Sequence, residues 1–446
     1  MKLKHLSQSV MLMGVAVGAF SSTAQASGYH FGSQSVSAQG TAFANSAEAS
    51  DASTIFYNPA GMSRLTGTNF SGGLTLVVPD SSYTDNGSTK HSGGSTGGGS
   101  TSGYAPDYVV APSFYATHQI NDKWTVGLGV FVPFGAELNY GETWAGRYSL
   151  ESIKLETLNF NPSVSYKLDD HHAFGFGVSA QYMKAYLSKA VDLTGVTSAT
   201  GDGHAALSAD GWGFGFNLGY MYQLNDATRF GVAYRSNIRQ KLDGKAYWDL
   251  SAISSSVVRQ IVENTYHHVN SDGSVTVDTP ESISVNGFHK LNDKVDLMAD
   301  LTWTRHSRLD QIDIKFSQAG EGDLVIKQGW RDTFKLSLGA NYHYSDNLLL
   351  RTGVAWDQSP VKNADETHPA LPDSDRYWLS FGANYKLSKQ SSLDFAYSYV
   401  FFKNANVNYT DSCTTTSTTC TGNGETTKGS YKTNLQFLGL QYNYSF

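Results

Sequence analysis

The feature that most constrains this chain is an alternation of large apolar residues with small or polar ones, which recurs along most of its length. At the C-terminus the large side chains occupy every second position: Leu438, Leu440, Tyr442, Tyr444 and Phe446. A period of two places them on one face of a β-strand. For one strand alone, this pattern fits a soluble β-sandwich as well as a membrane barrel. In lipid, such a sheet is stable only when closed, because an open edge leaves backbone groups unpaired.

The residues between the apolar positions favour the barrel. In residues 212–223 the large side chains alternate with glycine, asparagine, methionine and glutamine, so the opposite face is small and polar. A soluble sandwich needs apolar side chains on the inner face of each of its sheets. No apolar run approaches the 18 residues of a membrane-spanning helix. Together these patterns predict an all-β chain that crosses the membrane with strands.

Turn signals set the number of strands. Six short, mostly Asn- or Asp-containing sequences each join two alternating segments, and such residues suit tight turns: residues 121–123, 169–171, 225–227, 292–294, 345–347 and 388–390. One strand before them (69–78) and one after (433–446) bring the total to 14. The remaining connections are long, and in such barrels long loops face outward and short turns face the periplasm. The sequence therefore predicts a 14-stranded antiparallel transmembrane β-barrel in the bacterial outer membrane.

The N-terminal region divides into two parts ahead of the barrel. Lys2 and Lys4, an apolar run at 10–20 and Ala24-Gln25-Ala26 are typical of a secretory signal peptide, which we expect to cover residues 1–26. Residues 27–66 are small and polar without alternation, and we expect them to fold into the lumen as a plug, or hatch. An unstructured periplasmic tail is the alternative. Residues 67–446 then form the barrel.

Composition and motifs argue against several other functions. The net charge is −7 and only 16% of residues are charged, which suggests no nucleic-acid partner. The 13 histidines are scattered, and His306-Ser307 and His267-His268 lack a third partner, so we interpret them as rim histidines and expect no catalytic residue. No motif indicates a metal, a cofactor or nucleotide-driven transport. Cys413 and Cys420, the only cysteines, lie in a Ser/Thr-rich stretch. We expect a local disulfide there in an oxidising compartment, with a free redox pair as the alternative.

Several short motifs together carry a resemblance to a known family. They are Gly28-Tyr29-His30-Phe31, Asp51-Ala52-Ser53, Asn58-Pro59-Ala60, Trp212-Gly213-Phe214-Gly215-Phe216-Asn217, and the stretches at 351–357 and 372–378. The chain resembles the FadL family of outer-membrane transporters of long-chain fatty acids and hydrocarbons over its whole mature length. The resemblance implies a monomeric barrel closed to ions by an N-terminal hatch. It also implies that the ligand binds among the loops, enters an interior apolar pocket near the hatch N-terminus and leaves sideways through a gap in the wall. Whether the ligand is then released to the outer-membrane lipid or to the periplasm stays open.

Three prolines offer an independent sign of a wall opening. Pro112, Pro133 and Pro162 fall inside consecutive predicted strands at similar depth, and a proline cannot donate to the strand ladder. Phe134 and Gly135 follow Pro133, and the glycine permits a bend. With the family resemblance we expect a lateral opening at Pro112, Pro133, Phe134 and Gly135, although bulges that only curve the barrel are the alternative. Pro162 departs from the family pattern.

The ligand pocket is expected to combine apolar lining with inward cations. The resemblance places Tyr29 and Phe31 against the ligand, and a fatty acid carboxylate in an apolar cavity needs a cation. Alternation places Lys189 on the inner face, where the family has a basic residue, though a solvated rim lysine is equally consistent. The family's second basic position maps near Lys315, with Asp313 best aligned. Ile312 and Ile314 suggest outward positions there, which leaves the facing of Lys315 open. A neutral aromatic or alkane hydrocarbon is therefore an alternative substrate, and a general porin is an alternative function.

Overall fold

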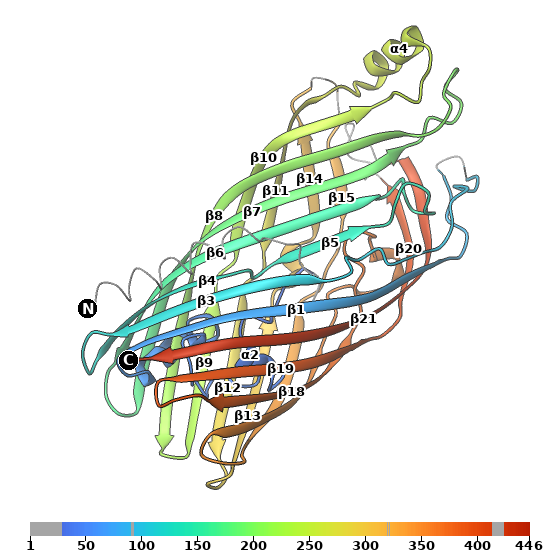
Figure 1. Ribbon diagram of the computed structural model, residues 1–446. Helices are drawn as coiled ribbons and strands as arrows, with labels where there is room; N and C mark the ends of the chain where they lie inside the picture. The colour runs from blue at the N-terminus through green and yellow to red at the C-terminus, as the bar shows by residue number, and fades with distance from the viewer. Residues whose placement is uncertain (1–28, 91–92, 319, 321, 413–422) are drawn as a thin grey trace.

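The computed structural model describes residues 29–90, 93–318, 320, 322–412 and 423–446, and its strands close into one antiparallel barrel (Figure 1). The barrel has 14 spans, as the turn signals predicted. The expected signal peptide (1–26) and both cysteines, Cys413 and Cys420, lie outside the described residues. No helix among the described residues is long and apolar enough to cross a membrane.

Eight spans are continuous strands and six are interrupted. The continuous strands are β1 (Thr68–Asp85), β3 (Val109–Gln119), β6 (Ser152–Lys167), β7 (His172–Val191), β8 (Gly203–Asn225), β17 (Leu348–Asp357), β18 (Arg376–Lys386) and β21 (Asn423–Ser445). Each interrupted span consists of two strands that follow each other along the chain with a break between them. These spans are β4 (Trp124–Phe131) and β5 (Gly135–Asn139), β9 (Thr228–Arg235) and β10 (Ile238–Asp249), β11 (Ser271–Thr279) and β12 (Ser282–Lys290), β13 (Val295–Thr304) and β14 (Gln311–Phe316), β15 (Leu324–Lys327) and β16 (Thr333–His343), and β19 (Ser391–Phe402) and β20 (Ala405–Ser412). A short β2 (Thr101–Ser102) pairs with β1.

The first and last strands close the barrel. β1 pairs with β21 from Asn69↔Ser445 to Asp85↔Gly429 without a register shift, and β1 also pairs with β3. Leu440, Tyr442 and Phe446 are exposed on the outer face, whereas Gln441 between them is buried. The alternation of the C-terminal tail therefore has the facing that the sequence predicted.

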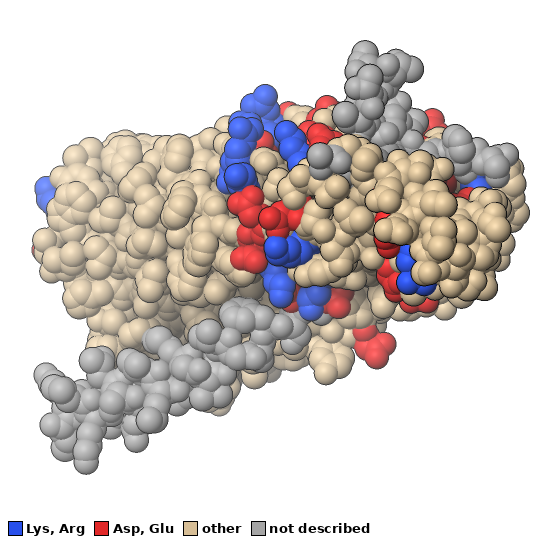
Figure 2. Space-filling model, turned by 90° about the horizontal axis from the view of Figure 1, so that it is seen from above, with Lys and Arg blue, Asp and Glu red and all other residues tan. Residues whose placement is uncertain are grey.

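The outer surface has an apolar zone next to a charged band. Figure 2 shows Lys, Arg, Asp and Glu side chains gathered across the middle of one face, and the wall to the left of this band is almost free of them. Arg239 and Lys241 on β10 expose 71% and 72% of their side chains. Trp212, Phe214 and Phe216 on β8 are also exposed. The apolar zone is the part of the surface that suits the lipid core.

The N-terminal segment (residues 29–65) lies inside the ring of strands. It contains α2 (Val36–Gln39), α3 (Thr54–Tyr57) and η1 (Pro59–Arg64). α2 packs against β18, β19 and β21, whereas η1 packs against β6, β7 and β8 on another part of the wall (Figure 1). Most of its side chains are buried. The short helices η2 (His306–Arg308) and η3 (Ala364–Glu366) and the longer α4 (Ser256–Tyr266) lie in connections between strands.

Candidate functional site

The Asn58-Pro59-Ala60 motif fixes the N-terminal segment to the wall at two glycines. The Asn58 side chain accepts a hydrogen bond from Ala60 N at 3.1 Å, which caps η1, and donates to the carbonyl of Tyr220 on β8 at 3.1 Å. A Cβ at Gly219 would lie 2.2 Å from Asn58 Oδ1, and one at Gly175 would lie 2.3 Å from Ala60 N. These glycines therefore permit a close approach of η1 to β7 and β8 that no other residue would allow.

Tyr29 and Phe31 lie in two different buried clusters. Tyr29 belongs to the large apolar cluster that fills the upper barrel, with ring centroids 5.3 Å from Phe134 and 5.9 Å from Trp330. Phe31 packs on the β21 side, 6.2 Å from Phe437. Each exposes 1% of its surface. The start of the N-terminal segment is thus surrounded by aromatic side chains deep inside the barrel.

The wall is interrupted at Pro133. The register of the β4–β5 span against β6 slips from Phe131↔Asn159 to Gly135↔Glu156, so residues 132–134 face only two residues of β6. On the other side, the β3–β4 ladder ends at Phe114↔Val130. The two segments next meet where Asn139 N donates to Tyr104 O at 2.6 Å. Between these two points, the described backbone of β3 runs beside the kink without ladder pairing.

The N-terminal segment takes up the backbone groups that the kink releases. Phe31 N donates to Pro133 O, and Gly135 N donates to Tyr29 O, both at 2.8 Å. The amide of Gln34 donates to Val132 O at 2.6 Å. A buried backbone group without such a partner would be costly. The interrupted wall and the start of the N-terminal segment therefore form one hydrogen-bonded unit.

The three prolines occupy different environments. Pro112 pairs with Leu74 on β1, on the part of β3 that lies beyond the end of its β4 ladder. Pro162 lies opposite Leu128 in the unbroken β4–β6 ladder, and the β6–β7 ladder skips residues 161 and 162 without a change of register. There Asn161 Nδ2 donates to the carbonyl of Val178 on β7 at 2.8 Å and replaces a donor that the proline lacks. Pro162 is therefore compensated locally, and Pro112 and Pro133 flank the interruption.

A cavity of about 120 Å³ with both polar and apolar lining lies between the N-terminal segment and the wall. Lys335 Nζ lies 4.0 Å from the ring centroid of Phe43, and Arg235 donates to Phe56 O at 2.9 Å. Both cations line this cavity, and the sequence analysis missed them. The alternation of apolar residues could have identified Lys335, because Phe334, Leu336 and Leu338 are exposed on the outer face and Lys335 therefore lies on the inner face.

Of the two lysines proposed from the sequence, one faces inward. Lys189 lies on the same face of β7 as Leu187, which packs against the upper apolar cluster, and it lines a cavity of about 530 Å³ beside Trp248 and Phe316. Lys315 is exposed, whereas its neighbour Ile314 is 2% exposed and part of the interior cluster. The interpretation of Ile314 as outward was wrong, and Lys315 points away from the interior. Residues 305–310 interrupt the span between β13 and β14, so facing cannot be carried across them.

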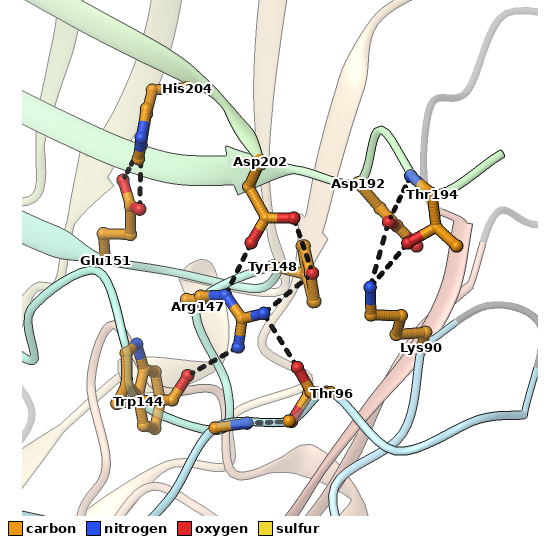
Figure 3. A network of polar contacts seen from close by, with 12 residues as sticks. Lys90, Thr96, Trp144, Arg147, Tyr148, Glu151, Asp192, Thr194, Asp202 and His204 are labelled. Atoms are coloured by element: carbon orange, nitrogen blue, oxygen red, sulfur yellow. Dashed lines mark hydrogen bonds and ion pairs between the residues drawn. The ribbon is translucent and has the colours of Figure 1, made fainter. Parts of the chain in front are cut away.

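Polar contacts tie three extracellular connections together over the mouth (Figure 3). Arg147 pairs with Asp202 at 2.8 Å and donates to Thr96 O at 2.8 Å, and Lys90 pairs with Asp192 at 3.2 Å. His204 lies 2.9 Å from Glu151, and burial raises the pKa of the Glu151 carboxyl. Tyr140 also donates to Pro369 O at 2.8 Å, which joins a fourth connection. Four of the connections at this end of the barrel are thus held to one another by polar contacts.

Buried ionisable groups also lie below these loops. Burial raises the pKa of Asp411 to about 6, and nearby Lys189 opposes this increase. His306 is 1% exposed and its ring lies 5.8 Å from that of Trp330, so its interpretation as a rim histidine was wrong. Within the described part of the chain, no group of three or more His, Cys, Asp or Glu side chains could hold a metal ion.

Comparisons with known proteins agree with this architecture. Residues 17–446 match the family described as outer membrane protein transport protein (OMPP1/FadL/TodX). A relative from Neisseria meningitidis, named only as an outer membrane protein, is 39% identical over 99% of both chains. The long-chain fatty acid transport protein of Escherichia coli K12 is 28% identical over 89% of this chain and 92% of its own.

Solved structures show the same fold. A crystal structure of a Pseudomonas aeruginosa FadL homologue superposes with a TM-score of 0.85 at 26% identity, covering 94% of this chain and 100% of that one. The toluene transporter TbuX of Ralstonia pickettii has a TM-score of 0.64 at 20% identity, with 89% and 94% covered.

Proposed function

The chain belongs to the family of outer membrane transport proteins described as OMPP1/FadL/TodX, and from this premise we propose that it carries long-chain fatty acids or similar hydrophobic compounds passively across the outer membrane. The observation that carries the proposal is the joint between the N-terminal segment and the wall, where Tyr29 and Phe31 bond to Gly135 and Pro133. An apolar ligand that reaches Tyr29 is already beside the interrupted wall.

In the proposed route, the 530 Å³ cavity beside Lys189 and Trp248 collects the ligand. The ligand then moves into the apolar cluster around Tyr29, where each buried methylene contributes about 0.8 kcal/mol. Exit takes place sideways between β3 and the Pro133 kink, with Pro112, Phe134 and Gly135 at its edges. The N-terminal segment acts as a hatch that blocks the straight path to the periplasm. Residues 1–26 are removed as a signal peptide, and the barrel acts as a monomer.

A carboxylate is proposed to bind at Lys335 and Arg235. Both side chains line the 120 Å³ cavity, whose lining also includes His30, the residue after Tyr29, and an anion in such a place needs cationic donors. Lys189 is proposed to make an earlier, weaker contact at the loops. These cations favour a fatty acid over the aromatic or alkane hydrocarbon that the sequence left as an alternative.

The proposal includes no chemical step. The family is one of transporters, and we propose that this chain binds and releases its ligand unchanged, without a cofactor. A general porin is the rival function, and the burial of residues 29–65 inside the ring of strands disfavours it.

Uptake of a labelled long-chain fatty acid tests the proposal. Cells that lack their own transporter but express this chain should take up the label faster than cells with an empty vector. A neutral hydrocarbon of equal length and a small hydrophilic sugar serve as comparison solutes. Uptake equal to the vector control, at a normal level of folded protein, would refute the proposal. Sugar entry with large steady ion currents in planar bilayers would establish the porin instead.

A further inference from the structure

The two strands that flank the interrupted wall are joined again on its extracellular side. Toward the periplasm, the β3–β4 ladder ends at Phe114↔Val130. Toward the outside, Asn139 N at the end of β5 donates to the carbonyl of Tyr104, in the segment that leads into β3, at 2.6 Å. Between these two points, no ladder pairing links β3 to β5 among the described residues (Figure 1). The interruption therefore has a defined lower end and a defined upper end.

Aromatic side chains reinforce the upper end. Tyr104, which precedes β3, and Tyr140, which follows β5, stack with ring centroids 4.5 Å apart and an interplanar angle of 25°. Trp144 stacks on Tyr140 at 4.1 Å and 15°. All three side chains are buried, and stacking is a favoured arrangement of aromatic pairs. We call these three side chains the aromatic clasp, because they join the two sides of the interruption.

Hydrogen bonds hold both tyrosines of the clasp in place. The hydroxyl of Tyr140 donates to Pro369 O at 2.8 Å, in the connection between β17 and β18. The hydroxyl of Tyr104 lies 3.3 Å from Thr433 Oγ1 on β21. Turning either ring away would break a contact of a buried polar group, which is costly. The two rings are therefore fixed at the polar end as well as by stacking.

The lumen side of the interruption is fixed too. Backbone hydrogen bonds of 2.8 Å from Phe31 N to Pro133 O and from Gly135 N to Tyr29 O hold the kinked residues against the N-terminal segment. The kink therefore cannot move without breaking these bonds. With the lower end set by the β3–β4 ladder, the distance between β3 and β5 depends on the clasp at the upper end.

We propose that the aromatic clasp limits the width of the sideways exit, and that it thereby selects unbranched acyl chains over ligands that carry a bulky group such as a fused ring system. The inference rests on the proposed function, because it concerns the exit that the ligand is proposed to use. An unbranched chain can pass end-on through a narrow opening, whereas a fused ring system cannot change its shape to do so. A clasp that stays closed during transport passes the first ligand and holds back the second.

Uptake of two long-chain fatty acids with the same number of chain carbons tests the selection. One is unbranched, and the other carries a pyrene group at its far end. Tyr104→Ala combined with Tyr140→Ala should raise the ratio of pyrene-acid uptake to unbranched-acid uptake by about tenfold over the unmodified chain, because discrimination by shape changes by at least this much when a site gains room for a carbon group. Binding of each acid to the purified variants is measured alongside, so that a change at the exit is separated from a change in binding.

Tyr431→Ala is the matched control for the double variant. Tyr431 is buried in the same cluster and its ring lies 6.0 Å from that of Tyr104, but it comes from β21 and joins neither side of the interruption. The uptake ratio should stay that of the unmodified chain. The single variant Tyr140→Ala takes the place of the double variant if the latter does not assemble.

Spin labels test the clasp without any ligand. In a chain whose own cysteines are replaced by serine, labels are attached at Tyr108→Cys, an exposed position ahead of β3, and at Glu137→Cys on the outer face of β5. The distribution of distances between the labels should become longer and broader when the clasp tyrosines are replaced by alanine. It should not change in Tyr431→Ala.

An unchanged distance distribution in the folded clasp variant would overturn the proposal. An unchanged uptake ratio, or an equal increase of the ratio in Tyr431→Ala, would overturn it too. If the unmodified chain takes up neither acid, the proposed function fails, and the spin labels still decide whether the clasp sets the spacing of β3 and β5.

Discussion

Two sides of this barrel hold the N-terminal segment by different kinds of contact. At the Pro133 kink the wall is interrupted and the N-terminal segment bonds to it through backbone groups, beside an apolar cluster. On β9, β12, β13 and β16 the wall is continuous at the level of the segment, and side-chain contacts such as Ser46 to Asp300 hold the segment in place. Backbone pairing suits a position that stays fixed while apolar ligand passes. Side-chain contacts suit a place where the segment has only to stay packed against an intact wall.

Restoring the wall at the kink should have the largest effect. Pro133→Val combined with Gly135→Thr adds a backbone donor and favours a strand, which should close the gap between β3 and β5. We expect fatty acid uptake to fall to the level of cells without the protein, while binding to purified barrel persists.

Pro162→Val is the matched control for this prediction, because the register of the wall does not slip at Pro162 and its missing donor is replaced by Asn161. Uptake should be unchanged in this variant. Undiminished uptake in the Pro133 and Gly135 double variant would mean that ligand leaves through the lumen and that these residues only shape the barrel.

The second largest effect should be on binding of the fatty acid carboxylate. Lys335→Met should weaken binding of a long-chain fatty acid by about 1.5–3 kcal/mol, roughly tenfold to a hundredfold, since a charge-assisted hydrogen bond is lost. Binding of a neutral hydrocarbon of equal length should hold. Isothermal titration in mild detergent measures both. Lys315→Met is the control, because Lys315 is exposed on the outer side of β14. Equal loss for both ligands would remove Lys335 from the carboxylate role.

A smaller effect should appear with pH below the loops. The pKa of Asp411 is about 6 in the folded chain, against a usual value of 3.8, because the carboxyl is buried. The folded state therefore favours the protonated form, and stability is lost as the pH rises from about 4 through 6. Asp411→Asn should be neutral below pH 4 and stabilise by up to about 3 kcal/mol above pH 6. Hydrogen exchange of β20 and β21 amides across this pH range measures the stabilisation by Asp411→Asn. A difference between the variant and the unmodified chain that does not change with pH would contradict the prediction.

The smallest effect should come from removing the Asn161 amide, which replaces the backbone donor that Pro162 lacks. Asn161→Ala leaves the Val178 carbonyl without its donor inside the wall, at a cost of about 1–3 kcal/mol. Urea unfolding in lipid vesicles measures this loss. Asn159→Ala is the comparison, since its amide makes only a 3.3 Å contact with Ser179. If both variants unfold at the same urea concentration, the Asn161 amide does not replace the ladder donor.

The wall was more predictable from sequence than the interior. All six predicted turns join neighbouring strands, because lipid outside and polar groups inside impose the alternation that reveals them. Of the five further interruptions, Pro280 marks the break between β11 and β12, and Gly329 marks the break between β15 and β16. The other three, between β9 and β10, β13 and β14, and β19 and β20, carry no proline or glycine that would have revealed them. The facing of Lys315 stayed open for this reason, whereas Lys335 could have been found because β16 alternates without a break.

Closure of the barrel also has a consequence for its biogenesis. β1 begins at Thr68 and pairs with β21, whose last residues end the chain, and Thr68 N and Phe446 O share a hydrogen bond of 2.8 Å. The barrel can therefore close only after β21 has been made. Residues 29–65 come before β1 and finish inside the ring, so they have to be in place when the first and last strands meet. In a variant whose N-terminal segment docks too slowly, the barrel would close while the segment is still outside it. The defect of such a variant would be one of assembly.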